Sequence, residues 1–281
     1  MPSVRMSLTL HSPETITMFS LATRQLAPDV RQGLDIVATI KAEGLMVGGV
    51  QLELRKELDF DVVSETGLRQ LNLLIKDRGL KVAAGVLATR YSLVEPDKID
   101  QRVDAVKRCM EVLGKLRASQ LICRLGKVPA EKEGRPYEKL FEIVTDLAGW
   151  GNRFGVSLCL STSFQELDRT LEFVDSIKSG PVTIDFDPLS VLKAGRDVNE
   201  TLRTALPFLG HATLQDAIRE REGDYQSAPI GEGEVEWLML TAVLQGAPTP
   251  VWKTIWVTSE DDPLKEVITG LQRLKPFLGF V

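Results

Sequence analysis

Apolar residues follow two alternating patterns along the chain. Short β-rich runs are separated by longer segments in which apolar residues recur at helical spacing. Such spacing predicts helices over 63–79 and 97–116, and in the second of these Val106, Met110 and Leu113 fall on one face with polar residues between them. Strands that alternate with amphipathic helices are typical of parallel βαβ units, in which each helix packs one face on the sheet.

Eight β-rich runs predict eight strands. Their ranges are 6–10, 47–54, 80–87, 119–125, 155–160, 181–186, 211–216 and 254–257. Gly44, Gly79, Gly155 and Gly246 fall where helices should end, and Asp97 is placed to cap the helix after it. The sequence therefore predicts one domain over residues 1–281, an α/β fold closed as a (β/α)8 TIM barrel.

The alternative is an open, doubly wound sheet. In that fold the turn after the first strand usually carries a G-x-G-x-x-G dinucleotide fingerprint. The turn after the first predicted strand reads HSPET instead. The closed barrel is the better interpretation.

Composition narrows the classes of partner. Apolar residues make up 43% of the 281 residues, charged residues 26%, and the formal net charge is -5. Mild acidity repels polyanions, so we expect no nucleic-acid partner. The first residues lack the apolar core of a signal peptide, and no apolar run approaches the roughly 18 residues that cross a bilayer. We expect a cytoplasmic protein with no membrane partner.

Cysteine and serine chemistry finds little support in the sequence. Cys109, Cys123 and Cys159 form no CxxC pair and lie within predicted helix or strand, which indicates inert core thiols and neither a disulfide framework nor a zinc site. The G-x-S-x-G motif is absent. His11 and His211, the two histidines, have no evident nucleophile beside them in sequence.

In a (β/α)8 barrel the site is built at the C-terminal ends of the strands and from the loops that follow them. The side chains there are the candidates for a functional site. In chain order they are His11, Glu53, Arg55, Thr89, Arg90, Arg124, Lys127, Ser161, Thr162, Asp185, Asp187, Thr213, Gln215, Asp216, Trp256, Thr258 and Glu260.

Three arginines, Arg55, Arg90 and Arg124, end three successive predicted strands. Guanidinium groups that converge there suit a carboxylate or a phosphate, which they bind in a bidentate manner. The alternative is that they pair with Glu53, Asp187 and other inward acids. Both interpretations stay open at this point.

Two further features have competing interpretations. Asp187 is a metal ligand, a hydrogen-bond acceptor for substrate, or the N-cap of the turn DPLS, and its place at a strand end favours a site role. The segment GEGEVEW (231–237) opens a helix after the seventh predicted strand, where TIM barrels often bind phosphate. Its glutamates would repel phosphate, so we expect them to cap the helix and complement its dipole.

Several segments, taken in order, resemble one known family. They are KDRGLKVAAGVLATR, RVDAVKRCMEVLGKLRAS, LICRLGKVP, IDFDP and a DDP before the last predicted helix. Together they resemble the xylose isomerase-like TIM barrels of the sugar isomerase/epimerase superfamily. The resemblance implies one divalent metal held by Glu, Asp, His and Glu at the ends of strands five to eight. Such a metal polarises the carbonyl and hydroxyl of a sugar while carboxylates move the proton.

This chain keeps only part of that ligand set. Asp187 matches the family's strand-six Asp, whereas Ser161, Thr213 and Trp256 stand where the resemblance implies Glu, His and Glu. A shifted loop would bring Glu260 into the last place. His211 and Asp216 of the family's HxHxKD stretch remain, with Gln215 in the place of the Lys.

We therefore expect a sugar isomerase/epimerase relative with a carbohydrate pocket and a degraded or rebuilt metal site. The expected catalytic residues are Asp187, Asp216 and Glu260. The expected substrate-binding residues are His11, Glu53, Arg55, Arg90, Arg124 and Trp256. No cofactor is expected unless Asp187, Asp216 and Glu260 rebuild a site for one Mn, Mg, Co or Zn ion; the expected partner is a small sugar or sugar acid, and a homo-oligomer is left open.

Two other functions compete with this hypothesis. The first is a barrel without catalysis that binds a sugar or polyol, or a protein partner, which the substitutions at Ser161, Thr213 and Trp256 favour. The second is the abasic-DNA endonuclease branch of the superfamily, which uses a richer His/Asp/Glu set with several metals. Two histidines and a net charge of -5 speak against that branch.

Overall fold

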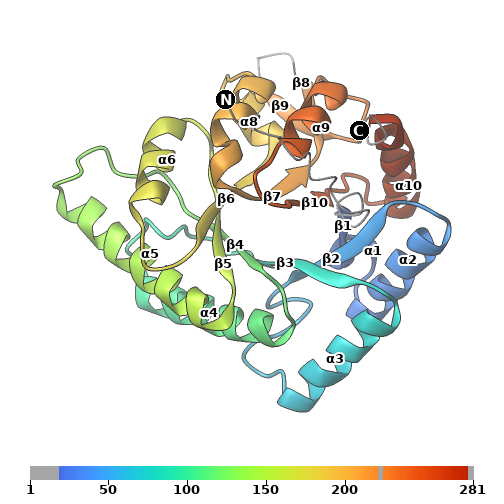
Figure 1. Ribbon diagram of the computed structural model, residues 1–281, viewed down its shortest axis with the longest axis horizontal. Coiled ribbons are helices and arrows are strands. Elements are labelled where there is room, and N and C mark those ends of the chain that lie inside the picture. The colour runs from blue at the N-terminus through green and yellow to red at the C-terminus, as the bar shows by residue number, and fades with distance from the viewer. Residues whose placement is uncertain (1–18, 221–223, 278–281) are drawn as a thin grey trace, which may run out of the picture.

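The computed structural model describes residues 19–220 and 224–277, and eight parallel strands in that part of the chain close into a barrel (Figure 1). Around the barrel the order is β1-β10-β7-β6-β5-β4-β3-β2. The strands are β1 (Phe19–Ala22), β2 (Val47–Glu53), β3 (Lys81–Leu87), β4 (Gln120–Arg124), β5 (Ser157–Ser161), β6 (Val182–Phe186), β7 (Leu209–Leu214) and β10 (Trp252–Ile255). The predicted TIM barrel is confirmed.

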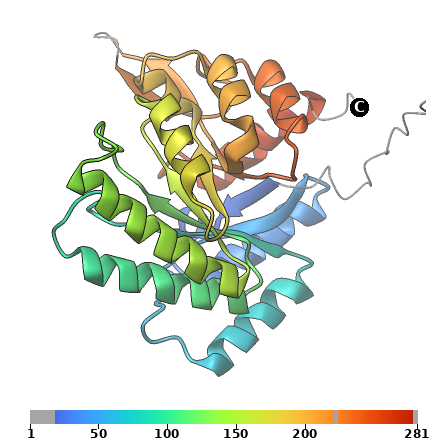
Figure 2. The same ribbon diagram turned by 60° about the vertical axis from the view of Figure 1, so that its left-hand side comes forward.

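The helices lie around the outside of the barrel (Figures 1 and 2). They are α1 (Thr23–Leu26), α2 (Val30–Ala42), α3 (Glu65–Asp77), α4 (Ile99–Lys115), α5 (Arg135–Phe154), α6 (Leu167–Ser176), α7 (Pro188–Lys193), α8 (Val198–Ala205), α9 (Trp237–Gln245) and α10 (Pro263–Leu274), with 3-10 turns η2 (Leu206–Phe208) and η3 (Lys275–Phe277). No helix of the described residues is both long and apolar enough to cross a membrane.

Local sequence accounts for these helices, as α5 illustrates. A proline stands in its first turn, where the missing N–H costs no hydrogen bond. Its buried residues, which include Leu140, Val144 and Leu147, recur at helical spacing and face the barrel. Gly155 ends the helix at φ 69°, in the left-handed region that glycine adopts without strain.

The predicted helix ends are mostly confirmed. Gly44 and Gly79 have positive φ just after α2 and α3, and Gly246 is the C-cap of α9. The predicted cap at Asp97 is wrong. Lys98 is the N-cap of α4, in a left-handed conformation, and Asp97 uses its carbonyl oxygen to accept from the Arg102 guanidinium.

Two strand predictions need correction. The first barrel strand is β1 (Phe19–Ala22), and the predicted strand 6–10 lies outside the described residues. The four residues of β1 pass directly into α1, so they leave no alternating run to recognise. The seventh strand ends at Leu214, and Asp216 opens a separate antiparallel hairpin, β8 (Asp216–Arg219) with β9 (Tyr225–Ala228).

The interior of the barrel has an apolar part and a polar part. Ala84, Ile122 and Cys159, on β3, β4 and β5, form a small buried cluster apart from the main core between sheet and helices. On the other side, Ser20, Thr254, His211 and Asp185 are buried polar residues of β1, β10, β7 and β6. Alternate residues of a strand share a face, so these polar groups lie below the strand ends that carry Thr213, Asp187 and Trp256.

Two glycines of α5 allow a matched test of the helix packing. A Cβ at Gly151 would collide with the carbonyl oxygen of Val156, whereas a Cβ at Gly149 makes only ordinary contacts of 3.8 Å or more. We expect Gly151→Ala to destabilise the fold by about 1–3 kcal/mol through overpacking. Gly149→Ala should instead stabilise it by about 0.5–1 kcal/mol. Urea unfolding of both variants measures the difference, and equal effects would contradict the packing shown for α5.

Candidate functional site

A cavity of about 620 Å³ opens at the C-terminal ends of the barrel strands. Every barrel strand from β2 to β7, together with the loop after β10, contributes to its wall. The polar and aromatic lining residues are Gln51, Thr89, Arg124, Lys127, Ser161, Thr162, Ser163, Asp185, Asp187, Ser190, Thr213, Gln215 and Trp256. The barrel-mouth cavity, as we call it, thus brings together most of the candidates that end strands four to eight.

Asp187 follows β6 and is the N-cap of α7. Its Oδ1 accepts from the Leu189 amide at 3.1 Å and from Gln215 Nε2 at 2.7 Å, and its Oδ2 accepts from Ser190 Oγ at 2.6 Å. Burial raises the pKa of this carboxyl above its ordinary value, although the Ser190 and Gln215 donors act in the opposite direction. Asp187 is therefore the N-cap of the turn DPLS, and it also lines the barrel-mouth cavity.

Asp185, two residues earlier on β6, is held from below. His211 Nδ1 lies 2.8 Å from Asp185 Oδ1, and Thr213 Oγ1 lies 3.1 and 3.0 Å from the two carboxylate oxygens. On its other side, His211 Nε2 lies 2.7 Å from Thr254 Oγ1. A Thr-His-Asp line therefore exists, but Thr254 and His211 are fully buried. A hydroxyl sealed from the cavity is not placed as a nucleophile.

The three arginines do not converge. Only Arg124 lines the barrel-mouth cavity. Arg55 lies over the Phe60 ring at 5.5 Å and Arg90 over the Tyr91 ring at 5.3 Å, both outside the cavity lining. Arg124 forms no ion pair with any residue in the described ranges; its Nη1 donates to the Arg90 carbonyl at 3.5 Å. The neighbouring Lys127 pairs with Glu166 at 3.1 Å.

Asp216 lies beneath the surface at the start of β8. It is fully buried, and its carboxylate accepts from the amides of Ala217, Gly231 and Val235 and from Trp237 Nε1, all between 2.8 and 3.0 Å. The GEGEVEW segment therefore does surround an anion, and that anion is the chain's own Asp216. Its glutamates do not cap α9, since the N-cap Glu236 makes no side-chain capping bond.

The remaining candidates lie away from the cavity or beyond the described residues. Glu260 is exposed in the loop after β10, and Thr258 in the same loop donates to Glu266 at 2.9 Å. Glu53 pairs with Lys56 at 3.6 Å and does not line the cavity. His11 falls outside the described residues.

Sequence reasoning missed one lining residue that the pattern could have indicated. Gln51 is a polar residue inside the apolar run of β2, where a strand buried on both faces is usually apolar throughout. Its side chain is 5% exposed and reaches the cavity, and its Oε1 has no hydrogen-bond partner among the described residues. A buried amide oxygen without a partner marks a place where a ligand can donate.

The donors at the mouth do not fit the divalent metal that the resemblance implies. In the described ranges, no three His, Cys, Asp or Glu side chains gather so that they could hold a metal ion. A hard divalent cation takes several charged or carbonyl oxygens. The positions of the implied ligands offer the Asp187 carboxylate, the hydroxyls of Ser161 and Thr213, and the indole of Trp256.

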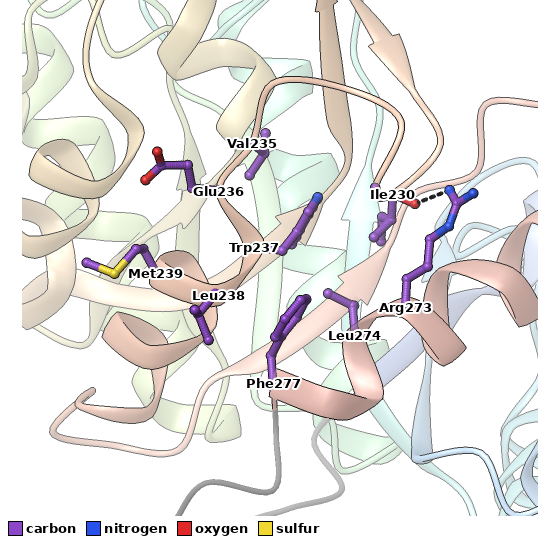
Figure 3. A pocket seen from close by; sticks show the side chains of 10 residues that line it. Ile230, Val235, Glu236, Trp237, Leu238, Met239, Arg273, Leu274 and Phe277 are labelled. Atoms are coloured by element: carbon purple, nitrogen blue, oxygen red, sulfur yellow. Dashed lines mark hydrogen bonds between the residues drawn. The ribbon is translucent and has the colours of Figure 1, made fainter.

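A second hollow of about 660 Å³ shares no lining residue with the barrel-mouth cavity. Figure 3 shows Trp237 at the start of α9, Leu274 at the end of α10 and Phe277 in η3 around it. Its arginine is already engaged, because Arg273 Nη1 donates to the Ile230 carbonyl at 2.7 Å and to Glu232 at 3.0 Å. The polar side chains that converge from several strands lie at the barrel mouth.

The surroundings of Asp216 lead to a stability prediction. Asp216→Asn places an amide against groups that all donate, so donors that were paired lose their acceptor. We expect a loss of about 2–4 kcal/mol in the free energy of unfolding, in the range found when a buried charged partner is removed. Glu260→Gln, at the exposed acid, is the control and should leave stability unchanged. Equal stability of both variants in urea unfolding would show that Asp216 does not hold the loop.

The raised pKa of Asp187 leads to a prediction about pH. The folded chain keeps this proton to a higher pH than the unfolded chain does. The contribution of Asp187 to stability is therefore greatest below the pKa of an unfolded aspartate and falls as pH rises through the raised folded value. Asp187→Asn cannot ionise, so it should gain stability relative to the native protein across that window. Urea unfolding at a series of pH values measures this gain, and a pH-independent difference would contradict it.

Comparison with known proteins places this geometry in a family. The family model described as "Xylose isomerase-like TIM barrel" matches residues 34–277. No curated protein matches the chain.

Three solved structures share the fold. The chain is similar to a xylose isomerase domain protein from Planctomyces limnophilus (TM-score 0.78, 17% identity, 93% of this chain and 96% of that chain). It is also similar to a D-psicose 3-epimerase from Clostridium cellulolyticum H10, solved with D-tagatose (0.71, 14%, 93% and 99%). A third is a xylose isomerase-like TIM barrel protein from Mycobacterium smegmatis in complex with magnesium (0.70, 14%, 96% and 98%).

At these identities the structural likeness shows the fold, whereas the family model covers most of the chain. The chain belongs to the xylose isomerase-like TIM barrel family.

Proposed function

We propose that the barrel-mouth cavity binds a small polyhydroxylated anion, a sugar acid or a sugar phosphate, and that it does so without a divalent metal. The cavity volume of about 620 Å³ lies within the range of small-molecule sites. Its wall combines hydroxyl and amide groups with one arginine, one lysine and two aspartates. Such a lining offers hydrogen bonds in many directions, which is what a ligand rich in hydroxyl groups requires.

The observation that carries this proposal is the environment of Asp187. In a metal site the cation would satisfy this carboxylate, but here the Leu189 amide, Ser190 and Gln215 donate to its two oxygens. Gln215 stands where the resemblance implies a lysine, and it presents a neutral donor at 2.7 Å. The acid is thus held in place by the chain itself, and a cation is not needed to orient it.

Arg124 supports the anionic part of the proposal. Its guanidinium lines the cavity, is exposed, and forms no ion pair within the described residues. A carboxylate or phosphate pairs with such a group through two parallel N–H donors. Arg55 and Arg90 have no part in this proposal, because each stacks on an aromatic ring outside the cavity.

Trp256 supplies an apolar surface at the opening. Its side chain is 39% exposed and lines the cavity. An indole in this position can lie against the C–H face of a sugar ring while its neighbours bind the hydroxyls. The complex of the similar D-psicose 3-epimerase with D-tagatose is consistent with a carbohydrate ligand for this barrel.

A second candidate function is isomerase or epimerase activity, and one observation favours it. Burial raises the pKa of Asp187, and a carboxyl with a raised pKa in a cavity is suited to general acid/base chemistry. Asp216 and Glu260 do not join it, since Asp216 is saturated by four donors and Glu260 lies outside the cavity. Proton transfer would therefore depend on Asp187 as the one carboxyl of the predicted catalytic set at the mouth.

A calorimetric titration tests the proposal. The probes are D-gluconate, D-glucuronate, D-fructose 6-phosphate and uncharged D-tagatose, each titrated into the protein in EDTA and again in Mg²⁺ or Mn²⁺. We expect at least one anionic probe to bind equally with and without metal. Arg124→Ala should weaken this binding about tenfold or more, as loss of a charge-assisted pair does. Arg90→Ala is the matched control outside the cavity and should bind like the native protein.

The outcomes separate the candidates. Binding that needs the metal, or equal losses in the two arginine variants, would overturn the proposal. The same samples in D2O, followed by proton NMR, report exchange at a sugar carbon. Exchange that disappears in Asp187→Asn would establish the second candidate, whereas binding without exchange favours a barrel that binds its ligand without catalysis.

A further inference from the structure

A chain of buried hydrogen bonds crosses four neighbouring strands below the barrel-mouth cavity. Ser20 Oγ lies 2.7 Å from Thr254 Oγ1, which lies 2.7 Å from His211 Nε2. His211 Nδ1 lies 2.8 Å from Asp185 Oδ1. The side chains of Ser20, Thr254 and His211 are fully buried, so their polar atoms form hydrogen bonds within the protein and not with solvent.

The direction of this chain follows from its end at Asp185. A carboxylate only accepts, so His211 Nδ1 carries the hydrogen and donates to it. With the ring hydrogen on Nδ1, the other ring nitrogen, Nε2, is the acceptor to which the Thr254 hydroxyl can donate. Because the one hydrogen of Thr254 then points to His211, Thr254 accepts from Ser20 at 2.7 Å, a closer partner for the Ser20 hydroxyl than the Lys253 carbonyl oxygen at 3.5 Å. Each member donates toward Asp185, and this tautomer is assigned from the partners that each group meets.

The same constraint fixes a group that faces the cavity. Thr213 Oγ1 lies within 3.1 Å of both oxygens of Asp185, so its single hydrogen is committed to that carboxylate. The remaining lone pairs of Thr213 Oγ1 are left for the cavity that this residue lines. Thr213 therefore presents an acceptor, and it does so because Asp185 is held by His211.

Gln51 provides an independent observation at the same cavity. Its amide oxygen is buried and has no hydrogen-bond partner among the described residues, although the residue is 5% exposed. Buried acceptors without a partner are costly and rare. A ligand hydroxyl that donates to Gln51 would relieve that cost.

We propose that Thr213 Oγ1 and Gln51 Oε1 form a pair of acceptors that recognises hydroxyl hydrogens of the ligand, with Asp185 and His211 as positioning residues. This deepens the proposed function and rests on it, since the ligand occupies the same cavity. It assigns directions around the cavity: the anionic group lies toward Arg124 on β4, and hydroxyl groups lie toward Gln51 on β2 and Thr213 on β7. The ligand class is an anionic polyol whose hydroxyls are essential for recognition.

The first test needs no ligand. Histidine labelled with ¹⁵N reports the tautomer of His211 by NMR, and His211→Gln identifies its signals against those of His11. We expect Nδ1–H with Nε2 unprotonated in the free protein. A neutral ring with its hydrogen on Nε2 would overturn the proposal, because Asp185 would then have to carry a proton to donate to His211 Nδ1, and Thr213 would no longer face a carboxylate that only accepts.

The second test uses Thr213 variants of nearly equal shape. The probe is D-gluconate with its series of monodeoxy analogues, and sugar phosphates with their deoxy forms are the second series. In the native protein, removal of one particular hydroxyl should weaken binding about tenfold, the cost of a lost hydrogen bond at a buried site. Thr213→Val should remove that discrimination and Thr213→Ser should restore it. Thr183→Val, on β6 outside the cavity lining, is the matched control.

These outcomes keep the two proposals apart. If the native protein binds no probe in either series, the proposed function fails, and the tautomer measurement still decides whether Thr213 is an acceptor. Suppose instead that the native protein binds a probe, and that Thr213→Val and Gln51→Leu discriminate between hydroxyl and deoxy probes as strongly as the native protein. The proposed function then stands, and the proposed acceptor pair is wrong. The acceptor pair is supported if Thr213→Ser keeps the discrimination between hydroxyl and deoxy probes and Thr213→Val loses it.

Discussion

A carboxylate that leaves water must find hydrogen-bond donors within the protein, and this constraint shapes the whole mouth of the barrel. Three aspartates near the ends of β6 and β7 obey it in three ways. Asp185 takes a histidine and a threonine, Asp187 takes side chains of α7 and of the residue after β7, and Asp216 takes backbone amides and an indole. Each set of donors fixes a different piece of structure.

The same constraint explains how this member of the family can hold its acids without a cation. Asp185 and Asp187 are two residues apart at the end of one strand, so both face the mouth and their charges repel. A divalent ion would offset such repulsion in a metal site. Here each carboxylate has its own donors, and neither set is shared with the other. Two separate sets of donors thus hold the two acids in place.

The sequence was sufficient for the fold and for part of the site. Apolar runs separated by helical segments identified seven of the eight barrel strands, because a strand that is buried on both faces is apolar along its whole length. The position of the first barrel strand was not identified, since its four residues lead directly into a helix and are too few to show a strand pattern. Asp187, Thr213, Arg124 and Trp256 line the cavity as strand-end positions should. Tertiary contacts decide the direction in which a loop side chain points. The positions of Arg55 and Arg90 in the sequence therefore could not show that each stacks on an aromatic ring.

Asp216 shows most clearly what sequence position leaves undetermined. It is one residue away from Gln215, which reaches the cavity, but it faces the opposite way and is closed off by the glycine-containing loop that follows the β8–β9 hairpin. A Cβ at Gly233 would collide with Asp216 and with the backbone of Ala217, so the loop closes only with glycine there. Because Asp216 is completely buried, only other groups at the mouth can form hydrogen bonds or ion pairs with a molecule in the cavity. These are Arg124, Gln51, Thr213 and the half-buried Asp187, which all line the cavity, and in the proposed site their placement on different strands would orient a ligand.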